Sequence, residues 1–313
     1  MCAQPLCVRW EAPFLLDVLR TVSVHRHGGS DPTFRYDAEG AIWRTSRTPD
    51  GPGTLRIAAT GQGDTAVQRP PVVLAAAWGP GARWLLANLP DLLGASDDPS
   101  AFEPVHPRLR AITQALPGVR VGRSGRLFEA LVPAVLEQKV VGAEAFRAWR
   151  WLLRRYGEPA PGPAPAGMRV IPPPRLWASI PSWEWHRAGV EAVRARTVAA
   201  AARVAGRLEE VAQLAPAEAD RRLRTIPGIG VWTSAEIRQR ACGDADAVSV
   251  GDYHLPSLVG WTLAGRRTDD AGMLELLAPY AGHRHRVTRL LELRGSAPPR
   301  RGPRLPARDY RAI

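Results

Sequence analysis

The chain carries, at residues 223–235, the sequence Leu-Arg-Thr-Ile-Pro-Gly-Ile-Gly-Val-Trp-Thr-Ser-Ala. Pro227 fixes its own φ, and Gly228 and Gly230 permit left-handed or closely approached backbone, so a helix cannot continue through this point. Apolar residues lie on both sides of the break. The stretch therefore predicts two helices joined by a tight glycine hairpin. Such a hairpin gathers backbone N–H groups at the N-terminus of the second helix, where a phosphate binds readily.

A carboxylate follows this hairpin. Asp252 lies 22 residues after Gly230, in the turn Ser249-Val-Gly-Asp-Tyr-His254, which precedes another apolar segment. Aspartate is among the best N-cap residues, and Pro256 suits the first turn of a helix. Taken alone, the position of Asp252 favours a structural cap.

The chain is strongly basic. It has 42 Lys and Arg residues against 30 Asp and Glu, a net charge of +12 and a pI of about 10.9. Lys139 is the only lysine, so arginine supplies nearly all of the positive charge. A GC-rich source would explain arginine in place of lysine, but not the surplus of basic residues. The surplus predicts a polyanionic partner, and nucleic acid fits best.

The composition also indicates the cellular compartment and which cofactors to expect. The sequence is 45% hydrophobic, without an apolar run long enough to span a membrane and without the pattern of a signal peptide. We therefore expect a cytoplasmic protein, associated with the nucleoid if it binds DNA. Cys2, Cys7 and Cys242 are too few and too scattered for an iron–sulfur cluster or a zinc ribbon. No metal cofactor is expected.

Residues 1–105 predict a small α+β domain. Turn residues separate five short β-type runs, at residues 6–10, 34–36, 41–45, 54–58 and 72–78. Helix-like segments near residues 14–22 and 82–93 would cover the resulting antiparallel sheet. His25 and His27 are expected on its surface, and a Ser/Asp/Pro-rich linker follows from residue 96.

Residues 106–295 predict an all-α domain, which makes the fold class α+β. An apolar stripe of period 3.6 runs from Phe128 to Tyr156 and predicts one long helix that ends at Gly157. The proline-rich residues 158–174 predict an extended loop. Residues 296–313, rich in Pro and Arg, predict a disordered basic tail.

The hairpin and the aspartate together resemble the helix-hairpin-helix DNA glycosylases, and the resemblance covers almost the whole chain. Within them the sequence is similar to the bacterial 3-methyladenine DNA glycosylase II family, in which a β-rich domain precedes a helical one. Phe128-Glu-Ala-Leu-Val-Pro-Ala-Val-Leu-Glu-Gln138 resembles that family's Phe-Glu…Ile-Leu-x-Gln helix. Pro117-Gly-Val-Arg-Val121 resembles its Pro-Gly-Leu-Arg-Leu loop. The resemblance implies excision of alkylated bases from double-stranded DNA in base-excision repair.

The resemblance also implies a role for each matching residue. Asp252 matches the catalytic aspartate, whose charge stabilises the positive charge that develops on deoxyribose during N-glycosidic cleavage. Trp232 stands where relatives that also cut the backbone carry a Schiff-base lysine, so no lyase step is expected. Its ring would stack on a flipped cationic base, or it belongs to the core. Val121 matches the residue that fills the gap left by the flipped base.

The expected base pocket departs from the family pattern. Trp232 and Tyr253 are expected to line it. Glu236 stands where the family often has a second pocket aromatic, and His283 stands near its later pocket tryptophan. Glu236 would bind a base amino group or a cationic lesion, or it lies on a solvated helix face. These departures leave the range of lesions open.

The DNA contacts follow from the same resemblance. N–H groups around Gly228 and Gly230 would hold the phosphate 3′ of the lesion, with further contacts from Thr225, Thr233 and Arg224. The family's hairpin carbonyls also hold a monovalent cation, and no other cofactor is expected. The protein is expected to act as a monomer.

Two alternatives remain. One is a helix-hairpin-helix glycosylase of different specificity, for a mismatched, oxidised or bulky base. The other is a non-catalytic protein that uses the hairpin and the basic tail only to bind DNA. A binding module has no need of the Asp252 carboxylate, so this residue separates the two classes.

Overall fold

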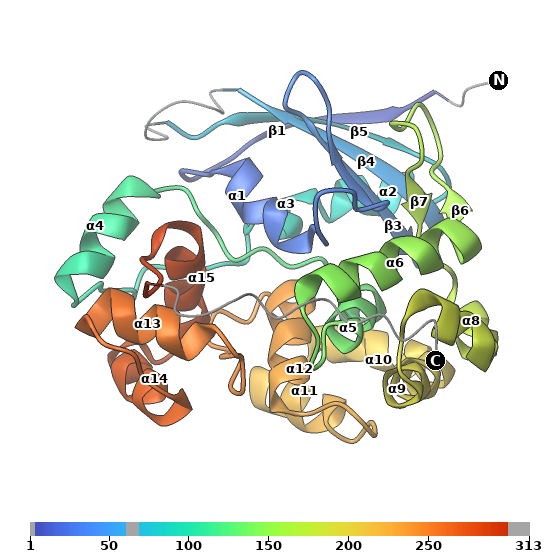
Figure 1. Cartoon of the computed structure of the whole chain (residues 1–313). Coiled ribbons are helices and arrows are strands. Elements are labelled where there is room, and N and C mark those ends of the chain that lie inside the picture. Colours follow the sequence, from blue (N-terminus) through green and yellow to red (C-terminus); the bar gives the residue numbers. More distant parts are fainter. Residues whose placement is uncertain (1–3, 61–68, 300–313) are drawn as a thin grey trace.

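The computed structural model describes residues 4–60 and 69–299. Within these ranges, five antiparallel strands form the sheet at the top of Figure 1, in the spatial order β1-β5-β4-β3-β2. Their bounds are β1 (Leu6–Glu11), β2 (Phe34–Tyr36), β3 (Ile42–Thr48), β4 (Gly51–Ala59) and β5 (Val72–Trp78). The antiparallel sheet expected from the sequence is confirmed.

Short helices cover one face of this sheet. They are α1 (Val18–Val22), α2 (Ala82–Ala87) and α3 (Leu89–Leu92), and α2 packs on β1, β4 and β5. The apolar side chains between the two layers are buried, among them Leu16, Phe34, Ile42, Leu55 and Leu89. This small core follows from the alternating pattern of the strands, because every second side chain points to the same face.

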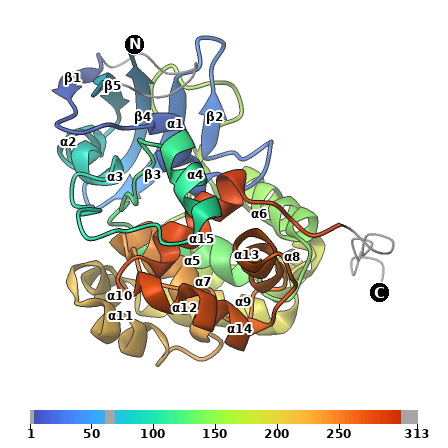
Figure 2. The same cartoon turned by 90° about the vertical axis from the view of Figure 1, so that its left-hand side faces the viewer.

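The rest of the described chain is mainly helical. The bounds are α4 (Pro107–Ala115), α5 (Leu127–Leu136), α6 (Gly142–Tyr156), α7 (Pro174–Ser179), α8 (Ser182–Ala188), α9 (Ala192–Arg203), α10 (Ala205–Glu209), α11 (Pro216–Leu223), α12 (Val231–Ile237), α13 (Leu255–Ala264), α14 (Asp270–Leu277) and α15 (Arg284–Arg294). A π-helical turn, Arg238–Cys242, continues α12. Figure 2 shows α4 beside the C-terminal helices, and it packs on α13 and α15.

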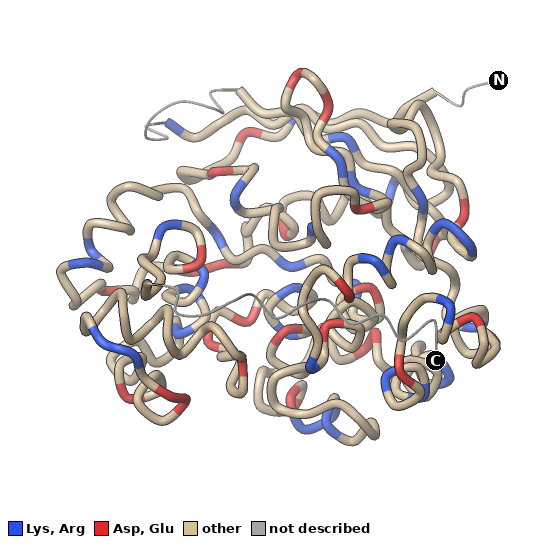
Figure 3. The backbone as a smooth tube through the Cα atoms, in the orientation of Figure 1, with Lys and Arg blue, Asp and Glu red and all other residues tan. Residues whose placement is uncertain are grey.

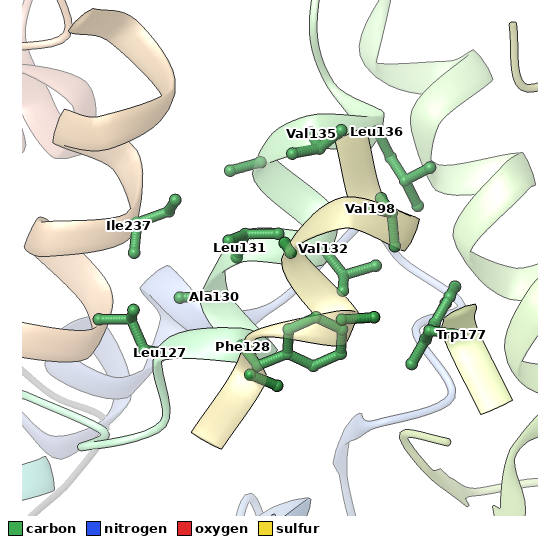
Figure 4. Close-up of a cluster of buried hydrophobic side chains, with 14 of the residues drawn as sticks. Leu127, Phe128, Ala130, Leu131, Val132, Val135, Leu136, Trp177, Val198 and Ile237 are labelled. Carbon is green, nitrogen blue, oxygen red and sulfur yellow. The ribbon is translucent and has the colours of Figure 1, made fainter. Parts of the chain in front are cut away.

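Helix α5 is the centre of the helical part. Nine of its ten residues are buried, which is typical of a helix enclosed on all sides. In Figure 4, Trp177 and Val198 lie on one side of α5 and Ile237 lies on the other. The exception among the ten is Glu129, which points to the sheet and accepts hydrogen bonds from Ser46 and from the backbone of Arg47.

The prediction of a single long helix from Phe128 to Tyr156 is wrong. The structure has two helices, because α5 ends at Leu136 and α6 begins at Gly142. Lys139 between them has φ +54°, a left-handed conformation that no helix can contain. The apolar pattern continues across the break because α5 is buried on all sides and α6 buries one face. The break places Glu137 and Gln138 at an accessible helix end.

The proline-rich segment is more ordered than expected. It contains two short paired strands, β6 (Glu158–Pro159) and β7 (Arg169–Val170). The hydroxyl of Thr45 in β3 donates to the carbonyl of Arg169 over 2.6 Å, and Met168 packs with the stacked rings of Trp43 and Trp78. The segment therefore leaves the helical part of the chain and packs on the sheet.

The two ends of the helical part are also anchored. In the expected linker, Asp97 forms a buried ion pair with Arg286 of α15. At the other end, Ser296 and Thr262 exchange hydrogen bonds of 3.0 and 3.1 Å. Residues 300–313, most of the expected basic tail, lie outside the described ranges. No helix in the described part of the chain is both long and apolar enough to cross a bilayer.

Candidate active site at the glycine hairpin

The expected hairpin joins α11 and α12. Gly228 has φ +90°, and a Cβ atom there would lie 2.0 Å from the hydroxyl oxygen of Thr197. Only glycine fits, because both the backbone conformation and the space exclude a side chain. The hairpin therefore packs closely against α9 at Thr197.

The start of α12 offers backbone N–H groups. Gly230 is its N-cap, and the N–H of Ser234 makes the first bond along the helix, to the Gly230 carbonyl over 2.9 Å. The N–H groups before Ser234 precede this ladder and need other partners. A Cβ atom at Gly230 would meet nothing within 4 Å, so the approach is open. This geometry suits a phosphate oxygen.

Gln138 fixes the hairpin against the end of α5. Its amide nitrogen donates to the Gly228 carbonyl over 2.9 Å and to the Thr233 hydroxyl over 2.8 Å. Thr233 is 3% exposed. The Thr233 hydroxyl is therefore enclosed between two helices, and the expected phosphate contact from Thr233 stays a prediction that only its backbone N–H can meet in this arrangement.

Arg224 and Thr225 are exposed at the entrance to the hairpin. Arg224 forms an ion pair of 3.4 Å with Asp220, and the Thr225 hydroxyl donates to the Arg222 carbonyl over 2.8 Å. Both side chains remain accessible, and an exposed ion pair is easily exchanged for a phosphate contact.

Asp252 is held by two sets of hydrogen bonds. One carboxylate oxygen accepts from the backbone N–H groups of His254 and Leu255 over 2.8 and 2.9 Å, as a cap of α13 does. The other oxygen accepts from the indole N–H of Trp232 over 3.2 Å. The structural and catalytic interpretations therefore do not compete, because one oxygen orients the group and the other faces the hairpin.

The other expected pocket residues do not all converge on Asp252. Tyr253 is 80% exposed and lines no enclosed pocket. Glu236 is neither free nor solvated, because it pairs with Arg240 over 2.7 Å and accepts from the Ser249 hydroxyl. Its expected contact with a base would have to compete with both partners.

His283 lies near the linker. Its ring packs edge-on against Phe102, with centroids 5.6 Å apart, and Arg286 donates to its Nδ1 over 3.3 Å. Burial, and then the charge of Arg286, lower the pKa of His283. The neutral ring faces the linker side of the helical part.

Val121 differs from the expectation of a wedge. It is 8% exposed, and its N–H donates to the Asp97 carboxylate over 3.0 Å. A wedge must present its apolar side chain to DNA, so the expected role of Val121 does not fit this arrangement. The loop of residues 117–121 instead contacts the linker through Asp97 and the segment before α1 through Asp17, whose N–H donates to the Gly118 carbonyl.

Sequence reasoning missed a group of buried titratable residues between the sheet and α5. His25 and His27, expected on the surface, are 8% and 9% exposed. Both line a cavity of about 30 Å³ together with Arg44, Glu129 and Arg240. Burial and then the charge of Arg44 hold the pKa of His25 well below its usual value. Separate short segments supply these residues, so no local motif reveals them.

The cation implied by the resemblance would need backbone ligands. No group of three or more His, Cys, Asp or Glu side chains in residues 4–60 and 69–299 is arranged to hold a metal ion. The Ile226 carbonyl accepts from the N–H of Ile229, and the Gly228 carbonyl accepts from Gln138. Each carbonyl has a second lone pair, so the donor set suits a monovalent ion, which stays a prediction.

Comparisons with known proteins bear on the fold. No protein-family model matches the sequence, and no curated protein matches it. A 3-methyladenine DNA glycosylase from Archaeoglobus fulgidus is 15% identical, with a TM-score of 0.73 over 91% of this chain and 97% of that one.

Two further solved structures are similar. An 8-oxoguanine glycosylase/lyase from Clostridium acetobutylicum, in complex with double-stranded DNA, is 11% identical, with a TM-score of 0.68 over 91% and 96% of the two chains. MBOgg1 in complex with a low-affinity DNA ligand is 14% identical, with a TM-score of 0.64 over 93% and 95%. The chain has the fold of the helix-hairpin-helix DNA glycosylases.

Proposed function

We propose that the protein is a monofunctional DNA glycosylase that hydrolyses the N-glycosidic bond of alkylated bases in double-stranded DNA. The observation that carries the proposal is the contact between Asp252 and Trp232 beside an open glycine hairpin. A binding module would need the hairpin alone. The 3-methyladenine glycosylase with a similar fold supports the choice of lesion.

The hairpin and the aspartate have different roles in this mechanism. The N–H groups around Gly230 bind a phosphate next to the lesion, which fixes the register of the DNA strand. The extruded nucleotide then brings its sugar to the Asp252 carboxylate. As the base departs, positive charge builds on deoxyribose, and the carboxylate stabilises it and orients the attacking water. Attack of the water on C1′ replaces the bond to the base, and the cationic methylpurine leaves as a neutral molecule. One proton of the water stays in the new hydroxyl of the abasic site, and the other passes to Asp252 and then to solvent.

Trp232 has two tasks in this mechanism. Its indole N–H holds the carboxylate, and the face of the ring attracts a cationic alkylated base. An indole cannot form a Schiff base, so the strand stays intact after base release. We therefore propose that the protein, acting as a monomer without a required cofactor, leaves abasic sites for later repair steps.

A second candidate is the removal of an oxidised base. The 8-oxoguanine glycosylase/lyase of similar fold favours it. The ion pair between Glu236 and Arg240, on the helix of Trp232 and the turn that continues it, favours it as well, because an oxidised purine offers more hydrogen-bonding groups than an alkylated one. The hairpin tryptophan argues against a shared lyase mechanism.

Base release from three matched duplexes separates these candidates. One duplex carries an N-methylated purine, one carries 8-oxoguanine and one is undamaged. The proposal expects free methylated base and strand breaks only after alkali. Release of 8-oxoguanine alone would favour the second candidate. Tight binding to all three duplexes without release would identify a DNA-binding protein.

A further inference from the structure

A second carboxylate lies beside the candidate active site. Glu137 is the C-cap residue that follows α5, and its side chain is 24% exposed. One carboxylate oxygen lies 3.4 Å from Nδ1 of His27, which comes from the sheet side of the molecule and has an 11% exposed side chain. An ionised carboxylate only accepts, so this contact requires the proton on Nδ1.

The surroundings of Glu137 place it near the hairpin. The next residue, Gln138, binds both Gly228 and Thr233. Thr233 is adjacent to Trp232, whose indole binds Asp252. Two hydrogen bonds, from Gln138 to Thr233 and from Trp232 to Asp252, thus connect the neighbourhood of Glu137 with that of Asp252. The charge of Asp252 also acts on the pKa of Glu137.

Helix stability does not explain this residue. A carboxylate at a helix C-terminus opposes the macrodipole, which costs a few tenths of a kcal/mol or more. The nearby guanidinium of Arg240 already has a closer partner in Glu236, over 2.7 Å. The second oxygen of Glu137 has no hydrogen-bond partner among the described residues. An anion with a spare acceptor at this position suits a ligand.

His27 is itself held rigidly. Its backbone N–H donates to Asp31 over 2.7 Å, and its ring packs edge-on against Trp149, with centroids 5.4 Å apart. Asp31 is fully buried and also accepts from the Trp149 indole over 2.9 Å. The imidazole therefore approaches Glu137 in a fixed orientation and fixes that side chain in turn.

We propose that Glu137, oriented by His27, is a specificity-determining residue that binds the cationic edge of the flipped base. This inference rests on the glycosylase function proposed above. It explains how the pocket selects a charged lesion although Glu236 is already paired with Arg240.

The protonation state of Glu137 agrees with an acceptor. Burial raises its pKa, but the hydrogen bond and charge of His27 and the charge of Arg240 outweigh burial, so the pKa is lowered overall. The carboxylate is ionised at neutral pH and can accept hydrogen bonds without donating one. It would favour a positively charged methylpurine over a neutral base such as hypoxanthine.

The test is a ratio of two rates. Single-turnover release is measured from duplexes that differ only in one base, a cationic N-methylpurine or neutral hypoxanthine. Glu137→Gln should lower release of the cationic base by about 10- to 100-fold, the effect of one charge-assisted hydrogen bond. Release of hypoxanthine should change little. Glu137→Asp should restore part of the ratio, and His27→Asn should lower it.

Glu129→Gln is the matched control, because Glu129 lies on the same helix and binds the sheet instead of the pocket. It should lower the melting temperature and leave the ratio of rates unchanged. If Glu137→Gln slows both bases equally, or neither, Glu137 has no role in specificity and the inference is overturned. If the unmodified protein releases neither base, the proposed glycosylase function itself fails.

Discussion

The indole N–H of Trp232 donates to the carboxylate of Asp252 over 3.2 Å, which joins the hairpin helix to the turn before α13. Trp232→Phe keeps an aromatic face and removes this donor. We expect roughly 10-fold slower base release or more, because hydrogen bonds to charged groups contribute about 1.5–3 kcal/mol. Single-turnover kinetics measure the effect. Unchanged kinetics would show that Asp252 needs no support from the indole.

The two hairpin glycines have separable roles. Gly228→Ala forces a Cβ atom to within 2.0 Å of Thr197 at φ +90°, so it should destabilise the protein by at least about 2 kcal/mol. Gly230→Ala meets nothing within 4 Å and should leave the melting temperature unchanged. It should still weaken DNA binding roughly tenfold, because a methyl group obstructs the approach of a phosphate. Equal melting temperatures for both variants would contradict this account.

Buried histidines make stability depend on pH. The pKa values of His25 and His285 lie well below the usual value near 6.5, and burial is the main cause in both cases. Both rings stay neutral in the folded protein while the unfolded chain binds protons below about pH 6.5. Stability should therefore fall as the pH falls below 6.5, by about 1.4 kcal/mol per pH unit for each histidine, until the folded pKa is reached.

Urea unfolding between pH 7.5 and 5 measures this slope. The double variant His25→Gln, His285→Gln should reduce the slope of the unfolding free energy against pH by the contribution of two histidines, about 2.8 kcal/mol per pH unit. His186→Gln is the control, because His186 is exposed on α8. A slope that the double variant leaves unchanged would show that other groups cause the pH dependence.

The ion pair between the sheet and α5 should matter for stability. Glu129 lies 3.4 Å from Arg44, and both side chains are largely buried, at 12% and 8% exposed. Glu129→Gln leaves the guanidinium without its carboxylate, which typically costs about 3–5 kcal/mol. Chemical denaturation measures the loss. A change below about 1 kcal/mol would mean that Asp31 or water replaces the missing charge.

The proposed absence of a lyase step has a simple chemical test. Lys139 is the only lysine, and it lies in the turn between α5 and α6 rather than on the hairpin helix. Borohydride treatment during reaction with damaged DNA should trap no covalent complex. A trapped complex that disappears in Lys139→Arg would contradict the monofunctional assignment and identify the amine.

Much of the architecture could be predicted from short-range patterns. Pro227, Gly228 and Gly230 mark the hairpin because proline and glycine interrupt a helix, and strands β2 and β5 have the expected bounds. The helix break at Lys139 could not be predicted. A non-glycine residue with positive φ has no sequence signature, and the apolar period continues across it.

The candidate site was predictable only where its residues lie in a motif. Asp252 and Trp232 belong to the hairpin pattern, and they are in contact. His27 and Glu137 lie 110 positions apart and meet only through the packing of the sheet on α5. The burial of Val121 and Thr233 likewise depends on neighbours from distant segments.

The net charge predicted the kind of partner, but the sequence did not show which basic residues would contact it. In Figure 3, basic positions are spread over the sheet, α6 and the C-terminal helices instead of forming one block. Many arginines are paired within the protein, including Arg240 with Glu236 and Arg286 with Asp97. Net charge therefore indicated a partner of opposite charge without indicating which arginines contact it.

Asp252→Asn removes the negative charge on which the proposed hydrolysis depends. The asparagine oxygen can still accept from the N–H groups of His254 and Leu255, so the turn should keep its conformation. Base release from an alkylated duplex is measured in a single turnover, together with binding to the same duplex. We predict release at least about 100-fold slower with binding retained. Release at the unmodified rate would contradict the assignment of Asp252 as the catalytic carboxylate.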